Sequence, residues 1–69
     1  MNVGANTKKF REDMNMSQAQ LAKAVNVTAA MISQIETGSK IPSIALAGRL
    51  ADQFNCTLDE LAYTQEVKK

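Results

Sequence analysis

The 69 residues are 45% hydrophobic and carry a formal net charge of +1, which leaves room for one small domain with a modest core. The single cysteine, Cys56, cannot form an internal disulfide, and the absence of histidine excludes a Cys/His metal site and a Cys–His catalytic pair. The apolar runs are too short for a membrane span, and the polar N-terminus shows no signal peptide, so we expect a cytoplasmic protein. We expect neither a metal nor a cofactor.

Four side chains near the N-terminus recur at gaps of four and three: Val3, Thr7, Phe10 and Met14. This spacing predicts a first helix that covers the core with one face. Asn15 is predicted to end the helix, because asparagine tolerates a left-handed backbone.

A second helix is predicted to begin at Ser17. Ser17 and Gln20 have the spacing of a capping box, and Met16 just outside it can pack against Leu21 one turn in. Asn26 suits the left-handed residue that ends a helix. The start and the end of this helix are therefore both marked.

The next helix follows after a very short turn. Thr28 can cap it, while Val27 and Ile32 can form a second hydrophobic contact across the cap. Ile32 and Ile35 continue the buried stripe, and Gly38 supplies a left-handed stop. Two short helices joined by a tight turn result.

The side of this helix opposite Ile32 and Ile35 holds small or mildly polar residues with nothing inside the domain to touch. They are Thr28 and Thr37 at the edges, with Ala29, Ala30, Ser33 and Gln34 between them. A nearly uncharged face of this kind suits insertion among base edges. A solvated helix face is the alternative, and it is the commoner one for an arbitrary amphipathic helix. The turn and the two caps over about residues 17–37 favour a helix-turn-helix DNA reader.

A fourth helix is predicted to begin at Ser43, after Pro42, and to end at Asn55. Its inward side chains recur at gaps of four: Leu46, Leu50 and Phe54. Gly48 weakens it by roughly 1 kcal/mol relative to alanine, unless a neighbour packs closely against the bare backbone.

A short fifth helix follows another capping box, Thr57 and Glu60, and carries Leu61 toward the core. Cys56 stands where it would face Leu61, which favours a buried structural thiol over a reactive one. No linker or repeat divides residues 1–69, so we expect one all-α domain of five helices.

Several motifs stand in a fixed order along nearly the whole chain: Phe10-Arg11, Ser17-Gln18 with Leu21-Ala22, the run from Ile32 to Gly38, Pro42-Ser43, Leu50-Ala51, and the run from Thr57 to Leu61. In this order they resemble the lambda-repressor-like helix-turn-helix family, which includes phage repressors and Cro-type proteins. The resemblance implies a compact five-helix DNA-binding domain in which helices 2 and 3 form the helix-turn-helix. It also implies a transcriptional regulator, with double-stranded DNA as its partner.

The outward residues are expected to divide between base reading and phosphate contact according to their places on the helices and loops. Base reading falls to Thr28, Ala29, Ala30, Ser33, Gln34 and Thr37, and phosphate contacts to Gln18, Ser39, Lys40 and Ser43. Alanine can touch a thymine methyl but cannot read a purine edge, so Ser33 and Gln34 are the main polar readers. A solvated loop charge is the alternative for Lys40. Arg11 and Glu36 match positions that commonly form a structural salt bridge in relatives.

Departures from the family pattern concern the core and the helix ends. Thr7 replaces a usual aliphatic residue and Ala47 a usual leucine, which thins the core, while three asparagines stand where relatives often have glycine. The charge is uneven: residues 1–49 hold six basic against three acidic side chains, and residues 50–69 hold two against four. The end with the helix-turn-helix is therefore the basic one.

Few basic side chains imply weak binding by a single subunit, so we expect a homodimer on an inverted-repeat operator, with a repressor of phage, plasmid or similar type as the function. The candidate dimer contacts lie near the C-terminus: Leu58, Leu61, Tyr63 and Val67. The tail 63–69 could equally be frayed.

A competing hypothesis is a protein-interaction module of the same fold, an antitoxin or antirepressor with weak or no DNA binding. The alanine pair and the low net charge support it. In either case a protein antagonist is a candidate partner. An enzyme is disfavoured, because the sequence offers no histidine, metal cluster, nucleophile–base pair or phosphate loop.

Overall fold

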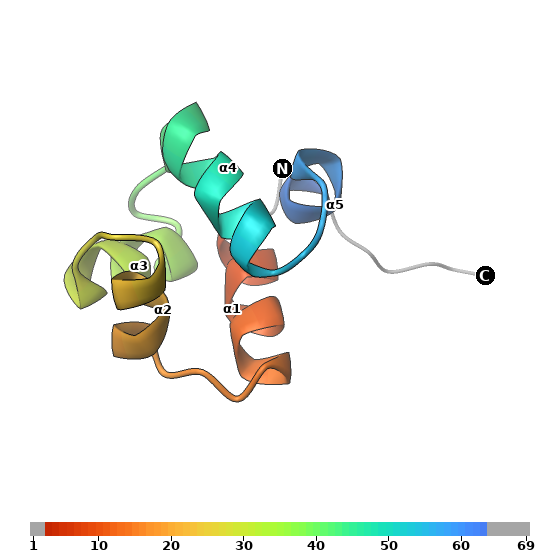
Figure 1. Cartoon of the computed structure of the whole chain (residues 1–69). Coiled ribbons are helices and arrows are strands. Elements are labelled where there is room, and N and C mark those ends of the chain that lie inside the picture. The colour runs from red at the N-terminus through yellow and green to blue at the C-terminus, as the bar shows by residue number, and fades with distance from the viewer. Residues whose placement is uncertain (1–2, 64–69) are drawn as a thin grey trace.

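Five helices account for most of the residues that the computed structural model describes, 3–63 (Figure 1). They are α1 (Val3–Asp13), α2 (Gln18–Ala24), α3 (Ala29–Thr37), α4 (Ile44–Gln53) and α5 (Leu58–Ala62). No strand occurs in residues 3–63, and no helix there is long and apolar enough to cross a membrane. The prediction of an all-α domain of five helices is confirmed for the described residues.

Local side-chain chemistry fixes where α2 to α5 begin. In each case a hydroxyl accepts a hydrogen bond from the backbone N–H three residues on, at 3.0 to 3.1 Å. The four caps are Ser17, Thr28, Ser43 and Thr57. At the first and last of these, a glutamine or glutamate side chain also returns to the cap N–H, which completes the two predicted capping boxes.

Left-handed residues fix where the helices stop. Asn15, Asn26 and Asn55 have φ values of 59°, 62° and 58°, and Gly38 has a φ of 88°. Asparagine adopts this conformation more readily than other side chains do, at a small cost relative to glycine. The predicted stops are confirmed at all four positions.

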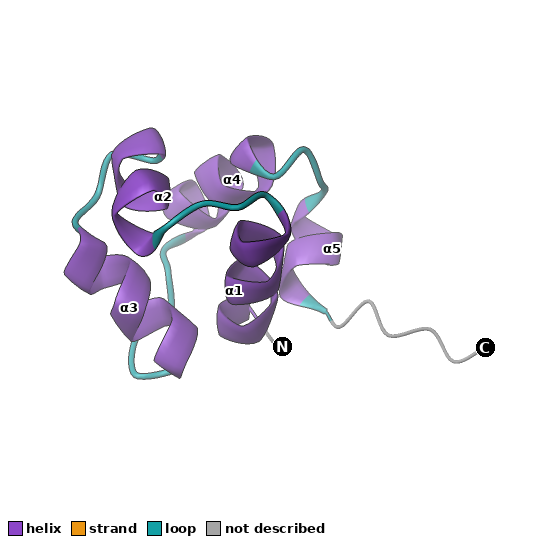
Figure 2. Ribbon diagram, turned by 90° about the horizontal axis from the view of Figure 1, so that it is seen from below, coloured by secondary structure: helices purple, strands orange, loops and turns teal. Residues whose placement is uncertain are grey.

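The core gathers apolar side chains from α2 to α5 and their ends: Leu21, Ala22, Val25, Ile32, Ile35, Leu46, Leu50, Ala51, Phe54 and Leu61. Helix α1 lies between the α2–α3 pair and α5, and packs against α3 on one side and α5 on the other (Figure 2). Phe10 of α1 stacks on Phe54, with ring centroids 5.3 Å apart. The two halves of the domain thus share α1 as a common support.

Two contacts of α1 depend on unusual residues. A Cβ on Gly4 would collide with the carbonyl oxygen of Ile35, so α1 can approach the end of α3 only with a bare backbone there. Asn6, which is buried, donates from Nδ2 to the carbonyls of Leu61 and Tyr63, both at 2.8 Å. Its amide therefore satisfies carbonyls at the end of α5 that the helix cannot.

The structure also corrects or refines the predicted core. Met14 was expected on the inner face of the first helix, but it lies beyond the end of α1 and is 46% exposed. Thr7 is fully buried, and its hydroxyl has no hydrogen-bond partner among the described residues. Nothing lies within 4 Å of a Cβ built on Gly48, so no close packing requires that glycine.

Candidate nucleic-acid interface

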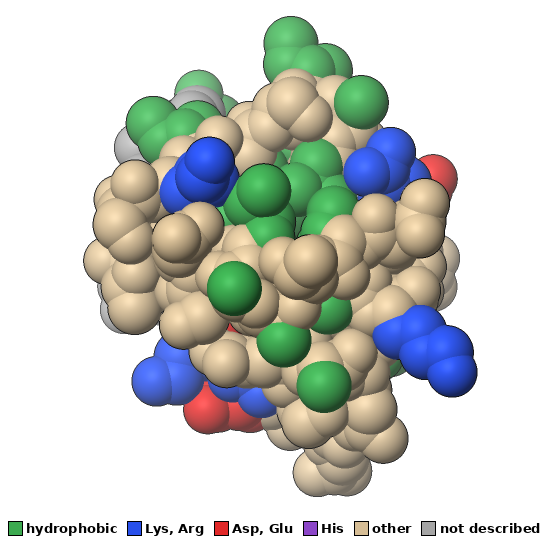
Figure 3. All heavy atoms as spheres, turned by 90° about the vertical axis from the view of Figure 1, so that its left-hand side faces the viewer, with side chains coloured by type: hydrophobic (Ala, Val, Ile, Leu, Met, Phe, Trp, Pro, Cys, Tyr) green, Lys and Arg blue, Asp and Glu red, His purple; other side chains and the backbone are tan. Residues whose placement is uncertain are grey.

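The side of α3 that faces away from the core is short and weakly polar. Ile32 and Ile35 are buried, whereas the residues on the other side are exposed, apart from half-buried Ser33. The exposed set consists of Thr28, Ala29, Ala30, Gln34 and Thr37. Figure 3 views the side of the molecule that carries α2 and α3, where small hydrophobic patches lie among backbone and uncharged polar side chains, with basic side chains around them. All six predicted base-reading residues thus belong to one region of the surface.

Hydroxyl groups organise the end of α3. The Gln34 carbonyl accepts hydrogen bonds from Thr37 Oγ1 at 3.1 Å and from the backbone N–H of Lys40 at 3.1 Å. Ser39 Oγ lies 3.0 Å from Thr37 Oγ1 and 3.4 Å from the same carbonyl. Because the N–H of Lys40 is already bonded, this residue can reach an anion only through its ammonium group.

A nearly buried ion pair connects α1 to the end of α3. Arg11 Nε donates to Glu36 Oε2 at 2.7 Å and Arg11 Nη2 donates to Glu36 Oε1 at 3.0 Å. The two side chains are only 11% and 3% exposed. The hydrogen bonds to Glu36 raise the pKa of Arg11 above its ordinary value. Arg11 and Glu36 therefore belong to the framework of the site rather than to its contact surface.

The same ion pair holds two segments next to it. Arg11 Nη1 donates to the Met16 carbonyl at 2.8 Å, and Gln18 Nε2 donates to Glu36 Oε1 at 3.1 Å. The loop before α2 and the first residue of α2 are thus attached to α1 and α3. Sequence reasoning missed the contact between Gln18 and Glu36, because the two residues are 18 positions apart in the chain and were predicted to have separate roles.

The four predicted phosphate-contact residues come from the ends of three helices. Gln18 opens α2 and is half-buried, Ser39 and Lys40 follow α3 and are exposed, and Ser43 caps α4. The Ser43 hydroxyl already accepts the Leu46 N–H at 3.1 Å. Its proton remains available to donate to an oxygen anion.

Cys56 lies between α4 and α5, away from the outward face of α3. The described residues contain no group of three or more His, Cys, Asp or Glu side chains that could hold a metal ion. Cys56 is half-buried against the core, and burial raises the pKa of its thiol, with a smaller contribution from the charge of Glu60.

Comparison with known proteins identifies the family. A family model described as helix-turn-helix matches residues 8–61. The chain belongs to the helix-turn-helix family. This helix-turn-helix chain is 34% identical over 59 residues to the HTH-type transcriptional regulator YazB of Bacillus subtilis, covering 86% of each chain. It is also 39% identical over 54 residues to an HTH-type transcriptional regulator of Archaeoglobus fulgidus, covering 78% of this chain and 76% of the other.

A solved structure of a repressor has a fold similar to that of this chain. The P22 c2 repressor, solved in complex with synthetic operator 9T, matches with a TM-score of 0.83 at 28% identity. The match covers 88% of this chain and 92% of the repressor chain. The similarity therefore extends beyond the helix-turn-helix to most of the described helices.

Proposed function

We propose that this chain is a sequence-specific DNA-binding transcriptional regulator that acts as a repressor by occupying an inverted-repeat operator as a homodimer. The observation that carries the proposal is the exposed, nearly uncharged face of α3, held on a core by Ile32 and Ile35. The P22 c2 repressor, which has a similar fold and was solved with an operator, supports the same role here.

Base reading is assigned to the exposed face of α3. Gln34 can donate to N7 and accept from N6 of an adenine, and Ser33 can bond to either kind of base edge. Ala29 and Ala30, at the start of the helix, can contact thymine methyl groups. The face therefore favours A·T pairs, because its assigned contacts are to adenine edges and thymine methyl groups and it carries no charged side chain to read a base.

Phosphate contacts are assigned to Gln18, Ser39, Lys40 and Ser43. They are few and mostly neutral, so the electrostatic part of binding is small. Only Lys40 of these four residues is charged, so a dimer neutralises about two phosphates through them, and the slope of log K against log salt is about −1.8. Weak binding by each subunit makes a second subunit on an adjacent half-site necessary for useful affinity.

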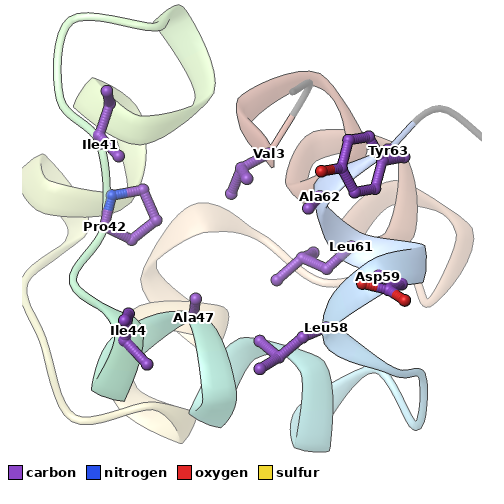
Figure 4. A pocket seen from close by; sticks show the side chains of 10 residues that line it. All are labelled: Val3, Ile41, Pro42, Ile44, Ala47, Leu58, Asp59, Leu61, Ala62 and Tyr63. Atoms are coloured by element: carbon purple, nitrogen blue, oxygen red, sulfur yellow. The ribbon is translucent and has the colours of Figure 1, made fainter.

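The dimer surface is assigned to a hollow of about 260 Å³ between the loop before α4 and the start and end of α5. Figure 4 shows Ile41 and Ile44 across this hollow from Leu58 and Tyr63, with Ala47 between them. These four large side chains are 78%, 84%, 47% and 56% exposed, respectively. Large exposed apolar side chains that line one hollow favour an interaction surface.

Two of the predicted dimer residues need comment. Leu61 was expected at this surface and lines the hollow, but its side chain is 1% exposed and packs in the core, so it offers almost no area to a partner. Val67, with the rest of the tail after Tyr63, lies outside the described residues. Leu58 and Tyr63 therefore stay in the proposal, and Ile41 and Ile44 join them.

A selection from a random pool of duplexes tests the function. We expect the chain to enrich one inverted repeat with half-sites about one helical turn apart, with recovery falling as the salt concentration is raised. Failure to enrich any sequence at low salt would contradict the regulator and favour the alternative of a protein-interaction module, which the alanine pair and the net charge of +1 support.

A further inference from the structure

The turn of the helix-turn-helix has a contact from outside the motif. Arg49, in the middle of α4, donates from Nε to the carbonyl of Val25 at 3.0 Å. Val25 is the residue at which α2 ends, with φ and ψ of −106° and 11°. Its carbonyl stands at the entrance of the turn that leads to Thr28 and α3.

Among the described residues, no neighbouring backbone N–H group donates to the Val25 carbonyl, whereas backbone N–H groups do donate to three carbonyls earlier in α2. Leu21, Ala22 and Lys23 carbonyls accept from backbone N–H groups of residues 25, 27 and 26. The Val25 carbonyl lies two residues beyond Lys23, and Arg49 bonds to it from a position 24 residues along the chain. A guanidinium at this point also carries positive charge to the negative end of α2.

The position of Arg49 gives this hydrogen bond a wider role. On one side it contacts the turn that sets where the first residues of α3 lie. On the other side its helix carries Ile44 and Ala47, which line the hollow assigned to dimer contact. A single contact thus connects the base-reading half of each subunit to the half that would face its partner.

We propose that Arg49 is a positioning residue of the DNA-binding site, which acts by holding the Val25 carbonyl and so the orientation of the turn, and not by neutralising a phosphate. The proposal rests on the proposed DNA-binding function. In Arg49 the Nε is bonded to the Val25 carbonyl, so the side-on grip of a phosphate through Nε and one Nη group is not available; an end-on contact through the two Nη groups is the alternative that the salt slope tests. The effect of Arg49 should therefore appear in sequence discrimination rather than in salt dependence.

Two matched variants separate the hydrogen bond from the charge. Arg49→Gln places an N–H donor on Cδ, where arginine has its Nε, but removes the charge. Arg49→Met removes both the donor and the charge at similar length. If the hydrogen bond matters, the methionine variant loses function and the glutamine variant retains most of it.

Binding is measured to a 20-bp duplex recovered by selection with the wild-type chain and to a mixed-sequence duplex of the same length. For Arg49→Met we expect a loss of roughly tenfold on the selected duplex, which corresponds to one hydrogen bond from a charged donor, and less than about twofold on the mixed one. The salt slope stays at the wild-type value. Equal losses for the two variants, together with a shallower slope in both, would overturn the proposal in favour of a phosphate contact.

A measurement without DNA keeps this test independent of the proposed function. In the free protein, the carbonyl ¹³C resonance of Val25 is expected to shift in Arg49→Met and to remain near its wild-type position in Arg49→Gln. Thermal melting of each variant checks that it is folded. An unchanged Val25 resonance in the folded methionine variant overturns the proposal, whereas failure to select any duplex with the wild-type chain contradicts the DNA-binding function alone.

Discussion

Arg11 and Glu36 form a bidentate ion pair in which the carboxylate is almost fully buried, at 3% exposure of its side chain. Glu36 lies near the end of α3, so the pair fixes α3 to α1 at the end opposite the Thr28 cap. Breaking such a pair by removing one partner costs more than the intact pair contributes, because the remaining charge is stranded.

Glu36→Gln is therefore expected to lower the free energy of unfolding by about 3 kcal/mol, as urea titration at neutral pH can measure. The matched control is the exposed pair between Lys9 and Asp13, at 3.5 Å, whose side chains are 69% and 62% exposed. Lys9→Met should change stability by less than about 0.5 kcal/mol. Similar effects of the two substitutions would show that the buried pair has no special role.

Much of the fold could be predicted from the sequence because the deciding chemistry is local. Asn26 takes its left-handed conformation, and Thr28 caps α3, through contacts within three residues along the chain. The exposed face of α3 follows in the same way from the positions of Ile32 and Ile35, because a helix repeats every 3.6 residues. Periodicity failed at Met14, where α1 had already ended at Asp13.

What could not be predicted depends on partners that are distant in sequence. Asn6 bonds to carbonyls 55 and 57 residues away, and Arg49 bonds to a carbonyl 24 residues away. A backbone carbonyl is present at every position, so no residue type in the sequence indicates which one a side chain will meet. Gly4 is similar, because only the packed structure shows the Ile35 carbonyl against it.

The two helical glycines Gly4 and Gly48 provide a matched pair of substitutions with opposite expected signs. Gly48→Ala should raise the free energy of unfolding by about 0.5 to 1 kcal/mol, because alanine favours the helix and nothing lies within 4 Å of the added Cβ. Gly4→Ala should destabilise the chain, because its Cβ meets the backbone of α3. Thermal unfolding of both variants checks the prediction, which fails if the two shift the midpoint in the same direction.

Thr7→Val is expected to stabilise the protein. Thr7 is 0% exposed and its hydroxyl has no partner among the described residues, so valine replaces an unsatisfied polar atom with a methyl group of similar shape. We expect a gain of about 1 kcal/mol, which for a domain of this size raises the melting temperature by about 4 to 8 °C. A lower melting temperature would indicate that the hydroxyl does find a partner.

Ile44→Asp is expected to weaken self-association and to leave folding intact. Ile44 is 84% exposed and lines the apolar hollow, so a carboxylate there would be buried without a partner in the dimer while remaining solvated in the monomer. Sedimentation equilibrium should show the dimer dissociation constant raised at least tenfold, which corresponds to about 1.4 kcal/mol. Ala45→Asp adds the same charge to the neighbouring exposed residue, outside the hollow, and should leave the dissociation constant near the wild-type value.

Substitutions of Gln34 and Lys40 are expected to change DNA binding in different ways, because Gln34 is assigned to base reading and Lys40 to phosphate contact. Gln34 is exposed on the face of α3, and its side chain can pair with an adenine edge, so Gln34→Ala should relax the preference at one base pair of each half-site by about 1 to 3 kcal/mol. Lys40 has only its ammonium group to offer, so Lys40→Ala should weaken binding to all duplexes alike and reduce the salt slope by about 0.9 per subunit. Titration of both variants against matched and scrambled duplexes at two salt concentrations measures the difference. Equal losses on the two duplexes for both variants would contradict this division of roles, since a residue that reads a base must discriminate between them.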